Sequence, residues 1–371
     1  MVAPLPRTPL PRQLRGVAVL VAALTGLIAV RWAVTGGPSR SLAPPGSAAV
    51  QVRHANGPAP AALPLLRGNL LYLGGRQALV LDPASGAINA LDRPGAGRLR
   101  VLRQGGFIVL LARDGQAAVQ PANGASRPRP LGQARDVLPS SHPDHVWLVS
   151  QKALAPDQTY LLREVDLATR RALRSWTLPY DAEPVAVVPQ GVVVSDLHDD
   201  LMLRDPSGRR PPRPLGAGLT FIDAHGSMLA YLDYRLHLRD LATGRDRVVP
   251  LPRGARSWSA VGPRLPGTGC CLQFGAFSPD AGTLAVFAEP GLAVVNVATG
   301  RASLLAGSEG ATPVACQPCL GWSRSGWLFF FNGGPGGADP AAWRPGERAT
   351  VPIALDVSSV TSVLPTSIAA A

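Results

Sequence analysis

The chain has 371 residues, of which 46% are hydrophobic and 16% are charged, so most of it is expected to fold around a sizeable core. Its 38 Pro and 40 Gly residues exceed what a helical protein tolerates and suit many short strands joined by turns. The net charge of +12 comes almost wholly from arginine, yet the sequence has no basic run or aromatic-basic motif of a nucleic-acid reader. These features exclude nucleic acid as the expected partner and favour anionic membrane surfaces or wall polymers.

The N-terminal residues predict an exported protein. Residues 16–34 are apolar with a single charge near their end, and as a helix they would span roughly 28 Å, close to the ~30 Å hydrocarbon thickness of a bilayer. Three arginines and no acid precede them, so the positive-inside rule keeps residues 1–15 in the cytoplasm as a short tail. We predict a single-pass transmembrane signal-anchor at 16–34, with a cleaved signal peptide and a secreted chain as the alternative. Residues 35–60, rich in Gly, Pro, Ser and Ala, are expected to form a flexible linker.

From residue 62 onward one unit recurs: an apolar run, a turn, a second apolar run that ends near Asp, a small-residue turn and another strand. The apolar runs are four to seven residues of Val, Leu, Ile and Tyr, which is typical of strands. The small-residue turns lie 36 to 56 residues apart, about 43 on average, which is the spacing of four-stranded propeller blades. These turns are centred on Gly86, Gly124, Arg170, Gly208, Gly244, Gly300 and Gly346.

The turn chemistry explains why the unit recurs. An Asp at the end of the third strand can accept hydrogen bonds from nearby amides, and Gly adopts the positive φ of a tight hairpin. Arg170 must then adopt a positive φ at some cost, or form another type of turn. We predict an all-β propeller over 61–356 with seven blades, six or eight being the alternatives. Residues 357–371 form either a C-terminal tail or the strand that closes the ring.

Two segments near the C-terminus carry a family resemblance. Residues 275–300, GAFSPDAGTLAVFAEPGLAVVNVATG, resemble the Ser-Pro-Asp-Gly pattern of TolB-type and tryptophan–aspartate-repeat propellers of bacteria. Residues 320–331, LGWSRSGWLFFF, are a degenerate copy. The resemblance covers roughly 62–356 and implies the propeller fold of the quinoprotein amine dehydrogenase-like superfamily, without implying a ligand. The preference for Arg over Lys, with abundant Ala, Gly and Pro, resembles the composition of actinobacterial proteins.

Two clusters of polar residues are candidate metal sites. His142 and His145, with Asp144 between them, could bind a metal ion, but a Pro-containing loop between blades is the preferred interpretation. The cluster at 198–200, His-Asp-Asp, is expected to be a solvated hairpin turn rather than a calcium site. Because the sequence contains no linear catalytic motif, we expect no catalytic residue, no cofactor and no resident metal.

The insertion at 252–269 lengthens one repeat and is the best candidate for a binding loop on the rim. Exposed Arg and Trp are favoured anchors at interfaces. The candidate anchors are Arg253, Arg256, Trp258 and Arg264. A second candidate is the Gly-rich stretch at 332–340, and both segments could instead be solvated spacers.

The four cysteines, Cys270, Cys271, Cys316 and Cys319, belong to the last two predicted blades. Cys271 and Cys316 each lie seven residues before the matching serine of their blade, so they occupy equivalent positions at the starts of neighbouring blades. For an exported protein this predicts two disulfides between the 270–271 pair and the 316/319 pair. A zinc site made of the four thiolates is the main alternative, and a redox role for the CxxC pair is a lesser one.

We therefore predict a membrane-anchored extracytoplasmic propeller that acts as a non-catalytic binding or scaffold module for an envelope protein, a wall polymer or a peptide. The alternative is an exported enzyme, such as a lactonase-like hydrolase or a quinoprotein-type dehydrogenase, with its site in the axial funnel. A membrane-tethered sensor is a third hypothesis. Carboxylates or histidines clustered at one mouth of the channel would favour the enzyme.

Overall fold

The computed structural model describes residues 64–74, 79–90, 100–123, 126–152, 159–196, 200–258, 274–311, 320–332, 339–353 and 367–370. All of them belong to one unit, Val50–Ala371. The predicted cytoplasmic tail, the transmembrane segment 16–34 and the linker lie outside the described residues. Among the described residues, no helix is long and apolar enough to cross a bilayer.

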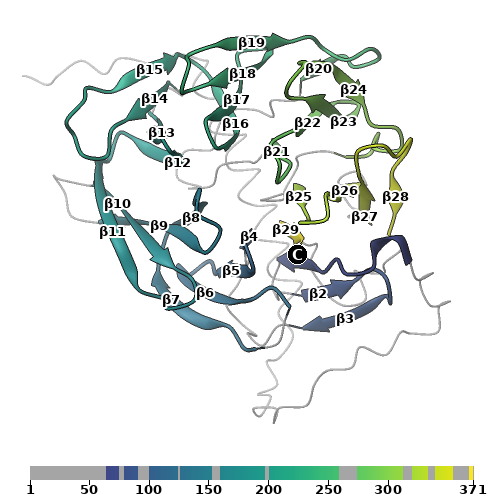
Figure 1. The fold of residues 1–371 in the computed structure, drawn as a ribbon, viewed down its shortest axis with the longest axis horizontal. Helices are drawn as coiled ribbons and strands as arrows, with labels where there is room; N and C mark the ends of the chain where they lie inside the picture. The colour runs from purple at the N-terminus through teal and green to yellow at the C-terminus, as the bar shows by residue number, and fades with distance from the viewer. Residues whose placement is uncertain are drawn as a thin grey trace, which may run out of the picture. The chain divides into compact units, whose positions relative to one another are not determined.

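The described chain forms antiparallel sheets that follow one another along the sequence, and each sheet is one blade of a propeller (Figure 1). Blade 1 consists of β29 (Ser367–Ala370), β1 (Leu71–Gly74), β2 (Leu79–Asp82) and β3 (Ala87–Ala90). Blade 2 consists of β4 (Arg100–Gln104), β5 (Phe107–Leu111), β6 (Gln116–Pro121) and β7 (Arg129–Gln133). Blade 3 consists of β8 (Asp136–Pro139), β9 (His145–Lys152), β10 (Thr159–Asp166) and β11 (Ala172–Pro179). Blade 4 consists of β12 (Glu183–Val188), β13 (Gly191–Ser195), β14 (Leu201–Arg204) and β15 (Arg213–Gly216).

The remaining sheets follow the same order, from the axis outwards. Blade 5 consists of β16 (Thr220–His225), β17 (Met228–Leu232), β18 (Leu236–Asp240) and β19 (Asp246–Val249). In blade 6, β20 (Ser257–Trp258) and β21 (Gly275–Phe277) both pair with β22 (Thr283–Glu289) and together take the place of the first strand, and β23 (Gly291–Asn296) and β24 (Ala302–Leu304) follow. Blade 7 consists of β25 (Leu320–Trp322), β26 (Leu328–Asn332), β27 (Asp339–Trp343) and β28 (Val351–Pro352). The all-β propeller predicted from the sequence is confirmed.

The last described strand closes the ring. β29 pairs antiparallel with β1, with Leu71 opposite Ala370, so that strands from both ends of the described chain share blade 1. The innermost strands contact one another in the cyclic order β29, β4, β8, β12, β16, β21 and β25, and β25 contacts β29 again. Of the two structures considered for residues 357–371, the ring-closing strand is the one observed, at Ser367–Ala370.

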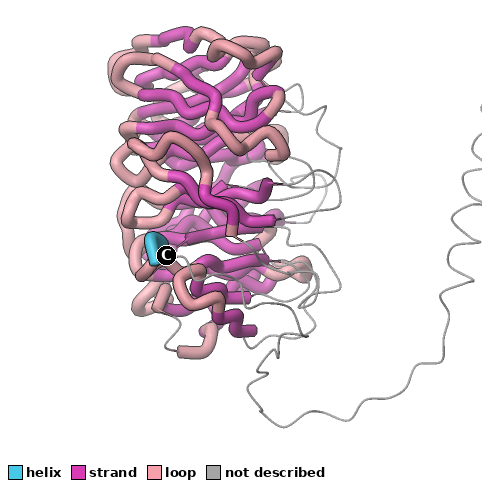
Figure 2. Tube along the Cα trace, turned by 90° about the vertical axis from the view of Figure 1, so that its right-hand side faces the viewer, coloured by secondary structure: helices cyan, strands magenta, loops and turns pink. Residues whose placement is uncertain are grey.

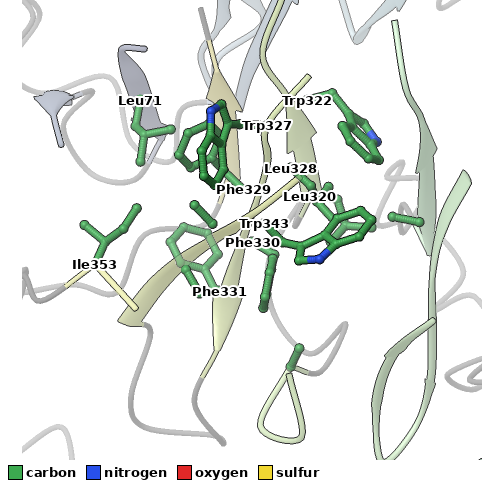
Figure 3. Close-up of a cluster of buried hydrophobic side chains, with 14 of the residues drawn as sticks. Leu71, Leu320, Trp322, Trp327, Leu328, Phe329, Phe330, Phe331, Trp343 and Ile353 are labelled. Carbon is green, nitrogen blue, oxygen red and sulfur yellow. The ribbon is translucent and has the colours of Figure 1, made fainter. Parts of the chain in front are cut away.

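The core lies between the faces of neighbouring blades. Val109 of blade 2 and Val146 of blade 3 belong to one buried cluster, and similar clusters join the other neighbouring blades. The aromatic side chains of blade 7 pack with Leu71 of blade 1 in the cluster that Figure 3 shows, where Phe330 is fully buried. Each large side chain buried in this way contributes about 1.5–3 kcal/mol to stability. The aromatic residues of blade 7 thus serve packing between blades.

The hairpin turns between the third and fourth strands have the predicted chemistry. In blade 5 the Asp240 carboxylate accepts hydrogen bonds from the Ala242 N–H at 2.9 Å and the Thr243 hydroxyl at 2.8 Å. Gly244 has a φ of 75°. Arg170 occupies the glycine position in blade 3 with a φ of 61°, so this turn keeps its type and accepts the strain.

Two kinds of turn lie on one face of the ring, which we call the turn face. It carries the turns between the first and second strands and those between the third and fourth strands. In blade 3 the Leu167 N–H donates to the Asp144 carbonyl at 2.8 Å, and in blade 5 the Leu241 N–H donates to the Ser227 carbonyl at 2.8 Å, which joins the two kinds of turn. The short helix η1 (Pro64–Leu66) lies where these turns gather (Figure 2). The opposite face, the loop face, carries the other connections.

Candidate binding surface

The predicted binding loop at 252–269 begins just after β19 ends, on the loop face between blades 5 and 6. Arg253 and Arg256 are exposed there. The Arg256 main-chain N–H donates to the Glu289 carbonyl at 2.8 Å, and its guanidinium lies 3.2 Å from the Glu289 carboxylate. This arrangement fixes the path of the segment while leaving both arginines accessible. The fourth predicted anchor, Arg264, lies outside the described residues.

Trp258 is not available as an interface anchor, which corrects the sequence interpretation. Its side chain is only 7% exposed and packs in a cluster that includes Phe274 and Leu284. The cause is a pairing between distant parts of the chain: Trp258 lies opposite Ala288 in the ladder between β20 and β22. Trp258 therefore anchors the segment that presents Arg253 and Arg256, and does not itself face a partner.

Tyr234, which sequence reasoning missed, is the most exposed large hydrophobic side chain among the described residues, at 100% exposure. It lies at the tip of the hairpin between β17 and β18 with a φ of 88°, which is uncommon for a bulky residue. The Arg235 N–H donates to the Asp233 carboxylate at 3.1 Å, and its guanidinium lies 3.3 Å from the same group. Strained backbone conformations of this kind cost about 1–3 kcal/mol and cluster at functional sites.

A partly buried network behind Tyr234 holds this hairpin. His237 contacts the Asp233 carboxylate at 2.9 Å through Nε2 and the Asp246 carboxylate at 3.2 Å through Nδ1. The Tyr231 ring stacks on His237 with 4.7 Å between centroids, and its hydroxyl donates to Asp246. Burial and the Asp246 carboxylate raise the Tyr231 pKa, so Tyr231 remains a protonated donor. The network stiffens the turn, and His237 is buried.

Five exposed residues of blades 5 and 6 lie at the loop-face end of these blades. Leu236, just after the Tyr234 turn, lies opposite Val249, and the chain then continues to the exposed Leu251 and Arg253. The candidate surface consists of Tyr234, Arg235, Leu251, Arg253 and Arg256. An aromatic residue, an aliphatic residue and three guanidinium groups can bind an apolar pocket surrounded by acidic groups.

At the loop-face ends of the inner strands, acidic side chains are paired with arginine. Arg100 of β4 forms an ion pair with Asp136 of β8. Arg135 lies 3.7 Å from Glu183 of β12. These contacts join consecutive blades and neutralise two of the carboxylates nearest the axis. Among the described residues, no group of three or more His, Cys, Asp or Glu side chains is placed to hold a metal ion.

The histidine cluster of blade 3 forms a turn between strands. His145 Nδ1 lies 3.3 Å from the Glu164 carboxylate, which also accepts hydrogen bonds from Ser140 at 3.0 Å and Arg174 at 2.5 Å. Burial alone would raise the pKa of Glu164, but these hydrogen bonds outweigh burial and lower it. His142 stacks on His145. The side chains therefore stabilise the blade.

Several other predicted sites lie partly or wholly outside the described residues. His198, Asp199, all four cysteines and most of 332–340 are outside them. Asp200 is described, and its carboxylate accepts the Gly218 N–H at 3.0 Å, as in a structural turn. The strands that follow the two cysteine pairs, β21 and β25, lie side by side, because the Trp322 indole donates to the Ala276 carbonyl at 2.9 Å. The disulfides stay a prediction.

No protein-family model matches the sequence, and no curated protein matches it. Among solved structures, the chain is similar to the acylaminoacyl peptidase of Pyrococcus horikoshii, with a TM-score of 0.54 and 11% identity over 79% of this chain and 52% of that one. TolB from Acinetobacter baumannii matches with a TM-score of 0.44 and 10% identity, over 82% of this chain and 67% of that one. A functionally unknown protein from Desulfotomaculum acetoxidans matches with a TM-score of 0.47 and 14% identity, over 77% and 96%.

The fold is that of a β-propeller. At these identities the likeness extends to the fold alone, and the chain spans about half the length of the peptidase. The prediction of a β-propeller is confirmed by the order of the sheets and by the likeness to the propeller-containing peptidase structure at the level of the fold. The sequence does contain a signal for Tyr234. The tripeptide Asp-Tyr-Arg lies between the apolar runs MLAYL and LHL, and this pattern marks a hairpin tip that has no glycine.

Proposed function

We propose that this propeller is a non-catalytic binding module that captures an envelope protein through the surface formed by Tyr234, Arg235, Leu251, Arg253 and Arg256. The observation that carries the proposal is Tyr234, a fully exposed aromatic side chain in a strained conformation on a braced turn. A turn that is rigid before binding loses little entropy on association, and Tyr and Arg are the side chains that contribute most at interfaces.

A protein partner fits this surface better than a polymer. A wall polymer offers repeated anionic groups, which arginines alone would bind. The combination of Tyr234 with the exposed Leu251 adds apolar area that requires a complementary pocket. The partner should therefore present an apolar pocket bordered by acidic side chains.

The proposed location is the outer side of the cell membrane, with residues 16–34 as the single-pass anchor. The apolar character of this segment and the arginines before it support that topology. The binding function is preferred over the exported enzyme because Asp136 and Glu183, on the inner strands, each lie beside an arginine.

The test is crosslinking of the intact full-length chain in its own cell envelope, followed by mass spectrometry. We expect a reproducible partner for the wild-type chain and at least about a tenfold loss of that partner for Tyr234→Ala, the size of a hot-spot truncation. Tyr180→Ala is the matched control, because Tyr180 is 41% exposed beyond the end of β11 in blade 3. Equal capture by wild type and Tyr234→Ala, or no partner for the wild type, would overturn the proposal.

A further inference from the structure

The turn face carries exposed arginines at equivalent positions in consecutive blades. In each case an arginine lies one or two residues after the central residue of the turn between the third and fourth strands. All of these side chains are exposed. We call this set the arginine rim: Arg171, Arg209, Arg245, Arg301 and Arg348, from blades 3 to 7.

The acidic side chains of these turns accept hydrogen bonds from residues of the same turn. Asp166 accepts the Thr169 hydroxyl at 2.9 Å, and Asp205 accepts the Ser207 N–H at 2.9 Å and hydroxyl at 2.8 Å. In blade 6 the same position is the neutral Asn296. The rim arginines form no ion pair with any other residue in the described part of the chain.

Charge counting agrees with this arrangement. In the six residues that begin each turn, the segments 166–171, 205–210, 296–301 and 344–349 each have one more arginine than acid, and 240–245 in blade 5 is neutral. Because the five arginines occupy the same place in repeated blades, they lie around one rim and do not converge on a point. Such an array suits an extended anionic surface better than a small anion.

The described chain also enters the ring from this face. Asn69, just after η1, accepts a hydrogen bond at 2.6 Å from Ser325, in the first turn of blade 7, and the Tyr72 hydroxyl donates at 2.5 Å to Ala122, beside the last turn of blade 2. Two exposed leucines accompany the arginines: Leu65 in η1 is 63% exposed, and Leu173, next to the rim in blade 3, is 50% exposed.

We propose that the arginine rim rests on the anionic headgroups of the bilayer that anchors the chain. This inference relies on the proposed membrane attachment through residues 16–34. The first described element, η1, lies on the turn face together with the arginine rim. Cationic side chains bind an anionic leaflet within about a Debye length, and exposed leucines add apolar contact with the interface. Docking in this orientation points the loop face, with Tyr234, away from the membrane.

The test uses the full chain with nanodiscs of phosphatidylcholine alone or of phosphatidylcholine with phosphatidylglycerol. Arginines are modified with phenylglyoxal and the sites are read by mass spectrometry. We expect the rim arginines to react more slowly on the anionic discs, with protection lost at high salt, whereas Arg235, Arg253 and Arg256 react equally on both discs. Equal reactivity of the rim on both discs would overturn this inference alone. Failure of the chain to co-elute with either disc would overturn the membrane attachment as well.

A charge-matched pair of triple variants sharpens the test. Arg209→Gln, Arg245→Gln and Arg301→Gln together remove three charges from the rim, and should raise the reaction rate of the remaining Arg171 and Arg348 on anionic discs by about fivefold or more. The control triple, Arg235→Gln, Arg253→Gln and Arg256→Gln, removes the same charge from the loop face and should leave those rates unchanged. The inference would be refuted if the two triples behaved alike while both kept the wild-type circular-dichroism spectrum.

Discussion

Asp223 of β16 links blades 5 and 6 through its carboxyl group, and desolvation disfavours the charged form of that group. Its carboxyl accepts the Phe277 N–H of β21 at 2.7 Å and the Ala224 N–H at 2.9 Å. Desolvation raises the Asp223 pKa to about 7, and these two hydrogen bonds only partly oppose that rise. The residue therefore remains protonated in the folded state at pH values where an unfolded chain has already released the proton.

This raised pKa predicts a stability that falls as pH rises. The contribution of Asp223 is fully present below the unfolded pKa of about 4 and is lost as pH rises through the folded pKa near 7. Asp223→Asn removes the titration but keeps an acceptor for Phe277, so its unfolding free energy should decline less between pH 4.5 and pH 8. Urea denaturation at a series of pH values measures the difference in unfolding free energy between wild type and Asp223→Asn. Each tenfold change in the proton affinity of Asp223 on folding corresponds to about 1.4 kcal/mol.

A control with the opposite sign is available in the same blade. Hydrogen bonds from Thr243 and Ser227 lower the Asp240 pKa, so its contribution is present above the unfolded pKa and is lost as pH falls. Asp240→Asn should therefore weaken the protein most at neutral pH. Parallel pH profiles for wild type and Asp223→Asn would show that the Asp223 carboxyl titrates normally.

At the scale of the element, the short strand β20 determines which residues of the predicted binding loop at 252–269 are exposed. Trp258→Ala should lower the free energy of unfolding by about 3–5 kcal/mol, because it empties a buried site in the cluster with Phe274. Arg256→Ala removes a side chain that is 77% exposed and should cost no more than about 1 kcal/mol. Denaturant titration of both variants measures these losses. A small loss of unfolding free energy for Trp258→Ala would contradict the burial of Trp258.

The sequence predicts those elements whose cause is local. The Asp at the end of a strand and the Gly three or four residues later define the outer turns by themselves, and even Arg170 adopts the backbone that the repeat requires. Trp258 was misplaced because its environment depends on a partner strand about thirty residues away. Tyr234 was missed because its exposure and its φ follow from the register of β17 and β18, and the hairpin tip Asp-Tyr-Arg contains no glycine to mark the turn.

At the scale of the molecule, the two faces of the ring carry different side chains. The turn face repeats one hairpin in successive blades and so repeats its arginine, which produces a rim that a single repeat does not reveal. The loop face differs between blades, because its connections vary in length and, among the described residues, blades 5 and 6 place the fully exposed Tyr234 near exposed arginines. The repeated face therefore suits a uniform surface such as a membrane, and the variable face suits a specific protein.

Such a division depends on a closed ring, and closure depends on four C-terminal residues. β29 covers the inner edge of β1 and contacts both β4 and β25, so its removal would expose the buried Leu71 and unpaired main-chain groups together. Deletion of residues 367–371 should lower the thermal midpoint by at least about 10 °C and broaden the transition. Deletion of residues 1–15, which lie outside the described blades, should leave the midpoint unchanged. Calorimetry of the two truncations decides the matter, because an unchanged melt without β29 would mean that the blades do not need the ring.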